Sequence, residues 1–268
     1  MRLSEGADMI CEIVYYSATD TTAQIVRAFS KGLSDTCIFS KINMLSHENA
    51  VHSEADLLVF AAPVYGGRIP VRIMNCFEKK CSNGKMVVGI AVYGNIHFGA
   101  SLIQLRRLAK KHHCIFIGAG AFVAEHTYSS DDAPIAKGRP DAYDLEQATW
   151  FGLAVQEKIS AGYTADAVLP PSDFPLFLTK LPDSTVRLVV KKPVIAGNCT
   201  HCGVCAKVCP TKAIDPSTLA IDASKCVRCY ACVKKCPQKA RKAEFIIGWL
   251  GYPFSRIGGK KKDAIWWV

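Results

Sequence analysis

Eight of the 13 cysteines in this 268-residue chain follow one spacing twice, Cys-x-x-Cys-x-x-Cys-x-x-x-Cys-Pro, and the second copy keeps every interval of the first. The first copy consists of Cys199, Cys202, Cys205, Cys209 and Pro210, and the second of Cys226, Cys229, Cys232, Cys236 and Pro237. Three thiolates at three-residue steps can wrap one face of an iron–sulfur cubane, and the proline stops the chain from continuing as a helix. This spacing is typical of bacterial proteins with two clusters, in which the fourth cysteine of each run ligates the other cluster.

The exchanged fourth cysteine divides the eight ligands into two sets. The first set, expected to hold cluster one, is Cys199, Cys202, Cys205 and Cys236. The second set, expected to hold cluster two, is Cys226, Cys229, Cys232 and Cys209. Zinc favours paired Cys-x-x-Cys units, and disulfides need an oxidising compartment and an export signal that this sequence does not display. We therefore prefer two [4Fe–4S] clusters, whose use in so small a module is electron transfer.

The net charge of +10 is concentrated at the C-terminal end. Residues 199–268 carry 13 basic and 4 acidic side chains, whereas residues 1–160 carry 16 of each. Two bound clusters, at about two negative charges each, reduce the balance of the C-terminal segment from +9 to roughly +5. We weighed nucleic acid as a partner for this charge and prefer an acidic redox protein or simple compensation of the clusters.

Hydrophobic residues make up 50% of the chain, which is enough for a buried core. The first residues lack the layout of a signal peptide, and no run is long and apolar enough to span a bilayer. We therefore expect a soluble cytoplasmic protein.

Strand-like and helix-like segments alternate along residues 1–160. Apolar β-rich stretches lie at 9–16, 56–62, 86–93 and 114–122, and helical patterns at 23–33, 71–79, 101–112 and 141–159. This alternation predicts an α/β fold with a parallel sheet covered on both faces. Ligands of such folds bind at the carboxyl ends of the strands.

Three loops at these strand ends have the composition of a binding site. The first is Ser17, Ala18, Thr19, Asp20, Thr21 and Thr22; the second is Pro63, Val64, Tyr65, Gly66 and Gly67; the third includes Tyr93, Gly94, Asn95 and Phe98. Hydroxyl and N–H groups at a helix start can bind a phosphate, and aromatic side chains can stack on a flat ring. Helix capping and ordinary turns are the alternative explanation of each loop taken singly.

These loops resemble those of the flavodoxin family, whose phosphate loop typically reads Ser/Thr-x-Thr-Gly-x-Thr. Ser17, Thr19 and Thr22 match that loop, and Asp20 stands in place of the glycine. A carboxylate near a phosphate repels it unless the side chain faces away. Tyr93, Gly94, Asn95 and Phe98 resemble the third loop, in which Ile96 replaces an arginine.

Nearly the whole chain resembles the flavodoxin–ferredoxin fusion proteins of anaerobic bacteria and archaea. The resemblance implies a doubly wound, five-stranded parallel sheet that binds FMN, followed by a small α+β ferredoxin-type domain with two [4Fe–4S] clusters. We divide the chain into an FMN domain (1–162), a Pro-rich packed linker (163–192), a ferredoxin domain (193–242) and an aromatic and basic tail (243–268).

The linker and the tail both contain apolar side chains that call for burial. In the linker these are Phe174, Leu176, Phe177, Leu178, Val186, Leu188 and Val190. Together with five prolines between residues 163 and 198, they predict a segment that lies across the FMN domain and fixes the ferredoxin domain against it. For the tail we expect packing on the protein's own domains or on a subunit partner, in preference to a membrane surface.

The function that fits these features is electron transfer between FMN and two [4Fe–4S] clusters, which couples one-electron and two-electron steps. No residue set indicates a catalyst, and Gly118-Ala-Gly-Ala lacks the third glycine of a nicotinamide site. The alternatives are an FMN-dependent oxidoreductase that reduces a small molecule, and a reductase subunit docked to one acidic partner. A redox partner protein with an acidic docking face is expected, nucleic acid is not, and a homo-oligomer is left open.

Overall fold

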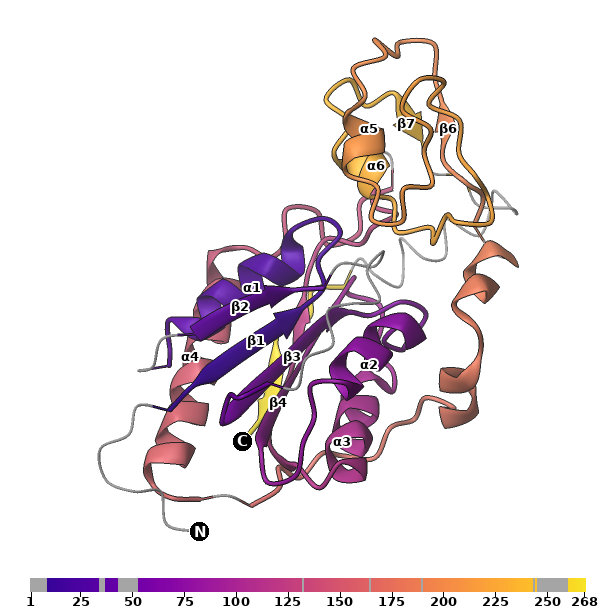
Figure 1. Cartoon of the computed structure of the whole chain (residues 1–268). Helices are drawn as coiled ribbons and strands as arrows, with labels where there is room; N and C mark the ends of the chain where they lie inside the picture. The colour runs from indigo at the N-terminus through magenta and orange to yellow at the C-terminus, as the bar shows by residue number, and fades with distance from the viewer. Residues whose placement is uncertain are drawn as a thin grey trace.

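A β-sheet with helices on both faces forms the larger part of the protein, and a smaller lobe contains the cysteine motifs (Figure 1). The computed structural model describes residues 9–33, 37–42, 53–131, 133–163, 165–188, 190–242, 244 and 260–268. The strands of the sheet are β1 (Cys11–Tyr15), β2 (Cys37–Lys41), β3 (Leu57–Pro63), β4 (Met86–Tyr93), β5 (Ile115–Val123) and β8 (Ile265–Trp267). The main helices are α1 (Thr21–Ser30), α2 (Val71–Glu78), α3 (Ser101–Lys111) and α4 (Ala142–Ser160).

The strand order of the sheet identifies the fold. Among the described residues the order is β2-β1-β3-β4-β5-β8, and the first five strands are parallel to one another. The order 2-1-3-4-5 is that of the flavodoxin-like doubly wound fold, with its topological switch point between β1 and β3. The predicted fold class is therefore confirmed, and β2 occupies a segment to which the sequence pattern assigned no strand.

Each central strand supplies side chains to two hydrophobic cores, because successive residues of a strand point to opposite faces. Leu57 and Val59 of β3 pack with Phe29 of α1 and with α4, whereas Leu58 and Phe60 pack with α2 and α3. Helices α1 and α4 approach each other closely at Gly152, where a Cβ atom would lie 2.1 Å from the carbonyl oxygen of Phe29.

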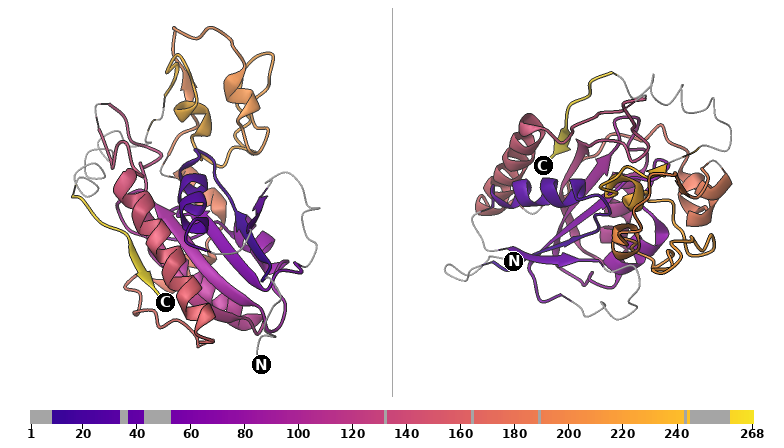
Figure 2. Two further views of the ribbon diagram at one scale, coloured as in Figure 1. Left: turned by 90° about the vertical axis from the view of Figure 1, so that its left-hand side faces the viewer. Right: turned by 90° about the horizontal axis from the view of Figure 1, so that it is seen from above.

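A sixth strand, which the sequence analysis did not predict, joins the sheet from the end of the chain. β8 pairs antiparallel with β5, and Ile265, Trp266 and Trp267 lie opposite Ala121, Gly120 and Ala119 (Figure 2). The ring of Trp266 packs on Phe151 of α4 at a centroid distance of 5.9 Å. The expectation that the tail packs on the protein's own domains is thus confirmed for residues 260–268. Its apolar stretch at 245–254 lies outside the described residues.

The segment between the sheet and the cysteine motifs packs on the flavodoxin-like domain through polar contacts. It contains the 3₁₀ helices η1 (Leu176–Lys180) and η2 (Asp183–Leu188). Asp183 accepts hydrogen bonds from the Arg68 guanidinium (3.2 Å) and from the backbone N–H of Val71 (3.1 Å), at the start of α2. The expected burial of its apolar side chains is wrong for Phe177 and Leu188, which are 71% and 77% exposed because the short 3₁₀ helices present them to solvent.

The small lobe has little regular structure. Its elements are β6 (Val194–Ile195), α5 (Val204–Lys207), α6 (Ala231–Lys234) and β7 (Arg241–Lys242). β6 and β7 pair antiparallel, and α5 and α6 each follow the second cysteine of one copy of the repeat. In Figures 1 and 2 the lobe lies beyond the carboxyl ends of the parallel strands, where the sequence placed the three loops.

Candidate functional site

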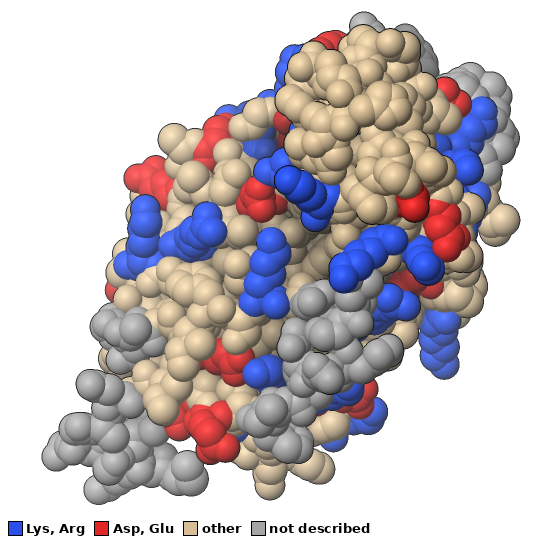
Figure 3. Space-filling view, turned by 45° about the horizontal axis from the view of Figure 1, so that its top comes forward, with Lys and Arg blue, Asp and Glu red and all other residues tan. Residues whose placement is uncertain are grey.

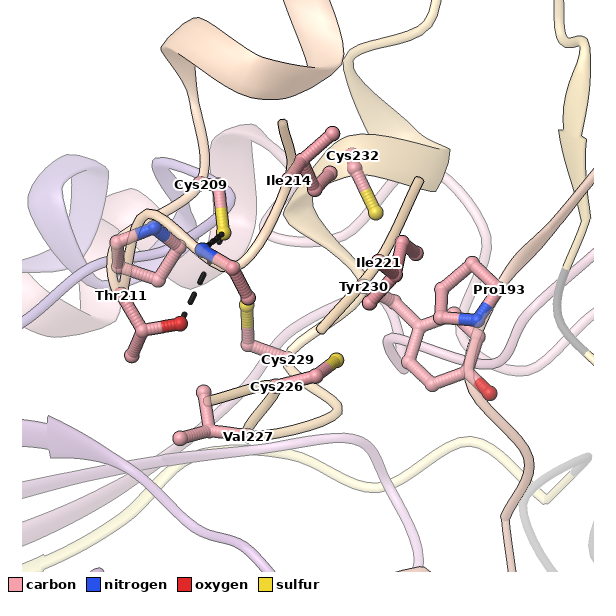
Figure 4. Close-up of a pocket in the computed structure, with 12 residues that line it drawn as sticks. Pro193, Cys209, Thr211, Ile214, Ile221, Cys226, Val227, Cys229, Tyr230 and Cys232 are labelled. Atoms are coloured by element: carbon pink, nitrogen blue, oxygen red, sulfur yellow. Dashed lines mark hydrogen bonds between the residues drawn. The ribbon is translucent and has the colours of Figure 1, made fainter. Parts of the chain in front are cut away.

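The second cysteine set lines a single pocket in the small lobe. The sulfur atoms of Cys209, Cys226, Cys229 and Cys232 surround a common space (Figure 4). Their neighbours are mostly apolar and include Ile214. Cys209, which belongs to the first copy in sequence, therefore lies with three cysteines of the second copy, as the exchanged-ligand pattern predicts.

The first cysteine set lines a second pocket in the same way. Cys199, Cys202, Cys205 and Cys236 surround it, and Cys236 here comes from the second copy of the repeat. The two pockets differ in their distance from solvent, because Cys202 is exposed whereas Cys229 and Cys232 of the other set are buried.

The backbone around both pockets is arranged to stabilise thiolates. The N–H of Ala213 donates to Cys209 Sγ, and the N–H of Ala240, at the equivalent position of the second copy, donates to Cys236 Sγ, both at 3.2 Å. Such N–H···S bonds are among the groups that tune iron–sulfur sites. Burial raises the pKa of the Cys229 and Cys232 thiols to about 12, so binding of a cluster must displace their protons. Within the described residues no three His, Cys, Asp or Glu side chains are grouped as ligands of a single metal ion.

The first loop lies at the start of α1, directly after β1. Ser17 Oγ accepts a hydrogen bond from the N–H of Ala23 (3.2 Å). Asp20, at the N-cap position, has a φ of +70°, in the left-handed region that explains why glycine is usual here. Its carboxylate does not cap the helix and instead pairs with Lys235 of the small lobe. Ser17 thus occupies the N–H of Ala23, which leaves the N–H groups of Thr21 and Thr22 at the start of α1 for an anionic ligand, and the charge of Asp20 is compensated.

The second and third loops contact each other and the linker. The N–H of Ala100 donates to the Gly67 carbonyl oxygen (2.8 Å), and the ring of Phe174 lies so close to Gly67 that a Cβ atom there would be 2.3 Å from it. Gly66 and Gly67 have φ angles of +60° and +76°, as the tight turn requires. Tyr93, expected as a stacking group, is only 4% exposed and belongs to the core.

The C-terminal tail also lies against the third loop. The Asn95 side-chain amide donates to the Lys260 carbonyl oxygen (2.7 Å), and the Lys262 ammonium donates to the Ile96 carbonyl oxygen. The structure thus brings the first, second and third loops to one edge of the sheet and adds the tail to them.

Three lysines of the second motif hold the small lobe on the flavodoxin-like domain. Lys234 Nζ donates to Glu125 Oε1 (2.5 Å) and to the Ser129 carbonyl oxygen (2.8 Å). Lys239 pairs with Asp131 at 3.0 Å, and Lys235 pairs with Asp20. In Figure 3 charged side chains gather around the base of the lobe, whereas much of its own surface on that face is uncharged. Part of the excess positive charge of the C-terminal segment is therefore paired with acidic residues of the flavodoxin-like domain.

Tyrosines fill the space between the loops and the second cysteine set. Burial raises the pKa of Tyr16 and of Tyr65 well above the ordinary value, and the proximity of Cys229 adds to this effect. The Tyr16 hydroxyl is buried and has no hydrogen-bond partner among the described residues. Tyr128 meets Tyr230 of the small lobe edge to face, with a centroid distance of 5.0 Å. The sequence analysis did not include Tyr16 and Tyr128 in the site. Their positions could have indicated them, because Tyr16 directly precedes the first loop and Tyr128 follows the end of β5.

The dipeptide Glu125-His126, which lies just after the end of β5, has a structural role. Glu125 bonds to Lys234, and His126 Nδ1 accepts a hydrogen bond from the N–H of Tyr128 (3.1 Å). Burial and the Lys234 charge lower the pKa of His126 to about 4, so the ring is neutral near pH 7. His126 is therefore a neutral, hydrogen-bonded histidine.

Comparison with known families supports the assignment of the small lobe. Residues 198–240, which contain all eight cysteines of the two sets, match the sequence family described as "4Fe-4S dicluster domain". No curated protein sequence shows significant similarity to the chain. None of the described helices combines the length and the apolar character that a membrane span requires.

The chain is also similar in fold to several solved flavodoxins. The WrbA-like flavodoxin of Agrobacterium tumefaciens is 17% identical, with a TM-score of 0.41, over 58% of this chain and 99% of that one. Oxidised flavodoxin 2 of Bacillus cereus is 14% identical, with a TM-score of 0.45, over 56% and 99% of the two chains. The rubredoxin oxygen:oxidoreductase of Desulfovibrio gigas is 13% identical, with a TM-score of 0.40, over 58% and 37%. The fold assignment rests on the strand order and not on these scores.

Proposed function

We propose that the protein transfers electrons between a bound FMN and two [4Fe–4S] clusters held at a fixed separation. One observation carries this proposal: the pocket of the second cysteine set lies against the edge of the sheet where the three loops meet. Val227, between two of its cysteines, packs on the same core as Tyr16 and Phe60. A flavin at the loops and a cluster in that pocket would be neighbours.

The residues fit these groups chemically. The start of α1, where Asp20 makes no capping hydrogen bond, would hold the FMN phosphate, with Ser17 and Thr22 beside it. The second and third loops would border the flavin ring. FMN can exchange one or two electrons, and each cluster exchanges one at a time. The protein contributes thiolate ligands, N–H···S bonds and a rigid interface that keeps the two sites in place.

The two cysteine sets take different places in this route. The second set is buried against the loops, so it would lie on the flavin side. The first set contains the exposed Cys202 and would exchange electrons with a partner protein. Lys207 on α5 is exposed near this set, whereas Lys234 and Lys235 on the other copy face the flavodoxin-like domain. We therefore expect a partner with an acidic docking face to bind beside α5.

The test is anaerobic purification followed by assays of iron, sulfide and FMN and by a redox titration. The proposal requires about eight iron atoms and about one FMN per chain, with separate flavin and cluster signals. Eight iron atoms without flavin would refute the flavin half. Turnover of a small molecule in the absence of a second protein would instead favour the oxidoreductase.

A further inference from the structure

A buried arginine contacts the first cysteine set. Arg241 on β7 is 5% exposed, whereas its neighbour Lys242 points to solvent. Arg241 Nη2 lies 3.6 Å from Cys205 Sγ and 2.5 Å from the Leu219 carbonyl oxygen, and the side chain lines the pocket of the first set. The arrangement places a fixed positive charge at the ligands of cluster one.

Among the residues that the structure describes, Arg241 has no carboxylate to balance its charge. Within the described part of the chain its side-chain partners are that sulfur and that carbonyl, and its buried Nε has no partner. A buried guanidinium without a counter-charge is strongly unfavourable, because it stays protonated at all ordinary pH values. The anionic thiolates and the cluster that they would bind are the compensating charge that the structure offers.

The internal repeat shows that this charge is specific to one of the two sites. Cys209-Pro-Thr-Lys-Ala is followed by Ile214, and Cys236-Pro-Gln-Lys-Ala is followed by Arg241 at the equivalent position. Ile214 is also 5% exposed and lines the pocket of the second set. Equivalent positions of the repeat thus place an aliphatic side chain at cluster two and a guanidinium at cluster one.

We propose that Arg241 makes cluster one the stronger electron acceptor of the pair, with a higher reduction potential than cluster two. Reduction adds a negative charge to a cluster, and a contacting positive charge that donates a hydrogen bond stabilises the reduced form. Electrons would therefore collect on the cluster with the exposed ligand Cys202, where a partner can take them. This inference rests on the proposed function, since it requires both clusters to be present.

The other buried arginine of the lobe does not cancel this asymmetry. Arg228 is 8% exposed, its Nε donates to the Val190 carbonyl oxygen (3.3 Å), and its buried Nη1 has no partner among the described residues. It differs from Arg241 in that it does not line the pocket of the second set, whereas Arg241 lines that of the first set and contacts Cys205 Sγ. Arg241 also lowers the pKa of Cys232, although burial raises it more, so its field reaches cluster two as well. Its direct contact with Cys205 makes the effect on cluster one the larger.

Redox titration of the anaerobically purified full chain, followed by electron paramagnetic resonance, tests the proposal. Arg241→Ile introduces the residue found at the equivalent position of the other site. It should lower the higher of the two cluster potentials by at least about 59 mV, which corresponds to a tenfold change in a one-electron equilibrium constant. The two potentials should move towards each other. Lys242→Gln removes an exposed charge from the next residue and should leave both unchanged.

Two conservative variants keep the test decisive if Arg241→Ile loses its clusters. Arg241→Lys retains the charge and should retain most of the potential, whereas Arg241→Gln retains a donor without the charge and should lower it. Equal potentials in these two variants, or an Arg241→Ile protein with both potentials unchanged, would overturn the proposal. Iron and sulfide are measured first: a wild-type chain without two clusters refutes the proposed function, whereas unchanged potentials in a fully loaded variant refute the role of Arg241 alone.

Discussion

Substitution of Lys234 by Gln should loosen the contact between the small lobe and the flavodoxin-like domain. The side chains of the Lys234–Glu125 pair are 23% and 27% exposed, and Lys234 also donates to the Ser129 carbonyl oxygen. Exposed ion pairs contribute up to about 1 kcal/mol, and breaking a buried pair costs about 3–5 kcal/mol. This partly buried pair lies between these limits, so we expect a loss of about 1–2 kcal/mol, or a roughly 5- to 30-fold larger population with the lobe detached.

Lys239→Gln is the matched control, because it removes the same charge from the same interface. Its pair with Asp131 has side chains that are 81% and 62% exposed, and solvent and salt screen it. Hydrogen exchange resolved by mass spectrometry measures both variants. Amide exchange in residues 125–131 should accelerate by the predicted factor in Lys234→Gln and stay unchanged in Lys239→Gln.

The same interface should respond to acid in a defined direction. Burial raises the pKa of Glu125, but hydrogen bonds from Lys234 and from the N–H of Gly138 more than offset this, so the folded-state pKa is lowered. The stabilisation from Glu125 is therefore complete above its ordinary pKa of 4.5 and is lost as the pH falls through the lower folded value.

Equal exchange rates in the two lysine variants at pH 7 would refute the argument that burial decides which pair holds the lobe.

Three further predictions concern the flavodoxin-like domain. In the folded protein the pKa of His126 is about 4, below its ordinary value of 6.5, so the free energy of unfolding should decrease by up to about 3 kcal/mol as the pH drops through this range. Denaturant titrations of His126→Gln should lack this pH dependence. Asp20→Gly relieves a left-handed residue and leaves Lys235 without its carboxylate, so FMN should bind as tightly or up to about tenfold more tightly in a fluorescence titration, and weaker binding would contradict this account. Gly152→Ala pushes a methyl group against the Phe29 carbonyl oxygen and should lower the free energy of unfolding by about 1–3 kcal/mol, measured by urea denaturation.

The cysteine sets were predictable because the ligand pattern is local and repeated. The short intervals between neighbouring cysteines determine which thiols can reach one cluster, and the position of Cys209 among the ligands of the other copy follows from the same pattern. The central strands were equally predictable, since buried parallel strands appear in the sequence as continuous apolar runs.

Elements that depend on distant contacts were not predictable. β2 is short and lies at the edge of the sheet, with Ile38 and Phe39 exposed, so its sequence lacks the apolar run of the other strands. β8 is shorter still and becomes a strand through pairing with β5, which lies far earlier in the chain. The pairing of Asp20 with Lys235 likewise requires the lobe to be docked before it can be seen.

The two copies of the cysteine motif are identical in spacing, yet the fold gives them different surroundings, and this difference sets the direction of the proposed route. In the second copy Lys234, Lys235 and Lys239 all bind acidic residues of the flavodoxin-like domain, so this copy is held at the loops. The first copy has His201 at the position of Arg228 in the second, and this histidine is exposed at the surface. Because each copy lends its fourth cysteine to the other site, movement of either copy would distort both clusters. The ion pairs that dock one copy therefore also fix the other, which in the proposed route would hold the exposed first set at a set distance from a flavin at the loops.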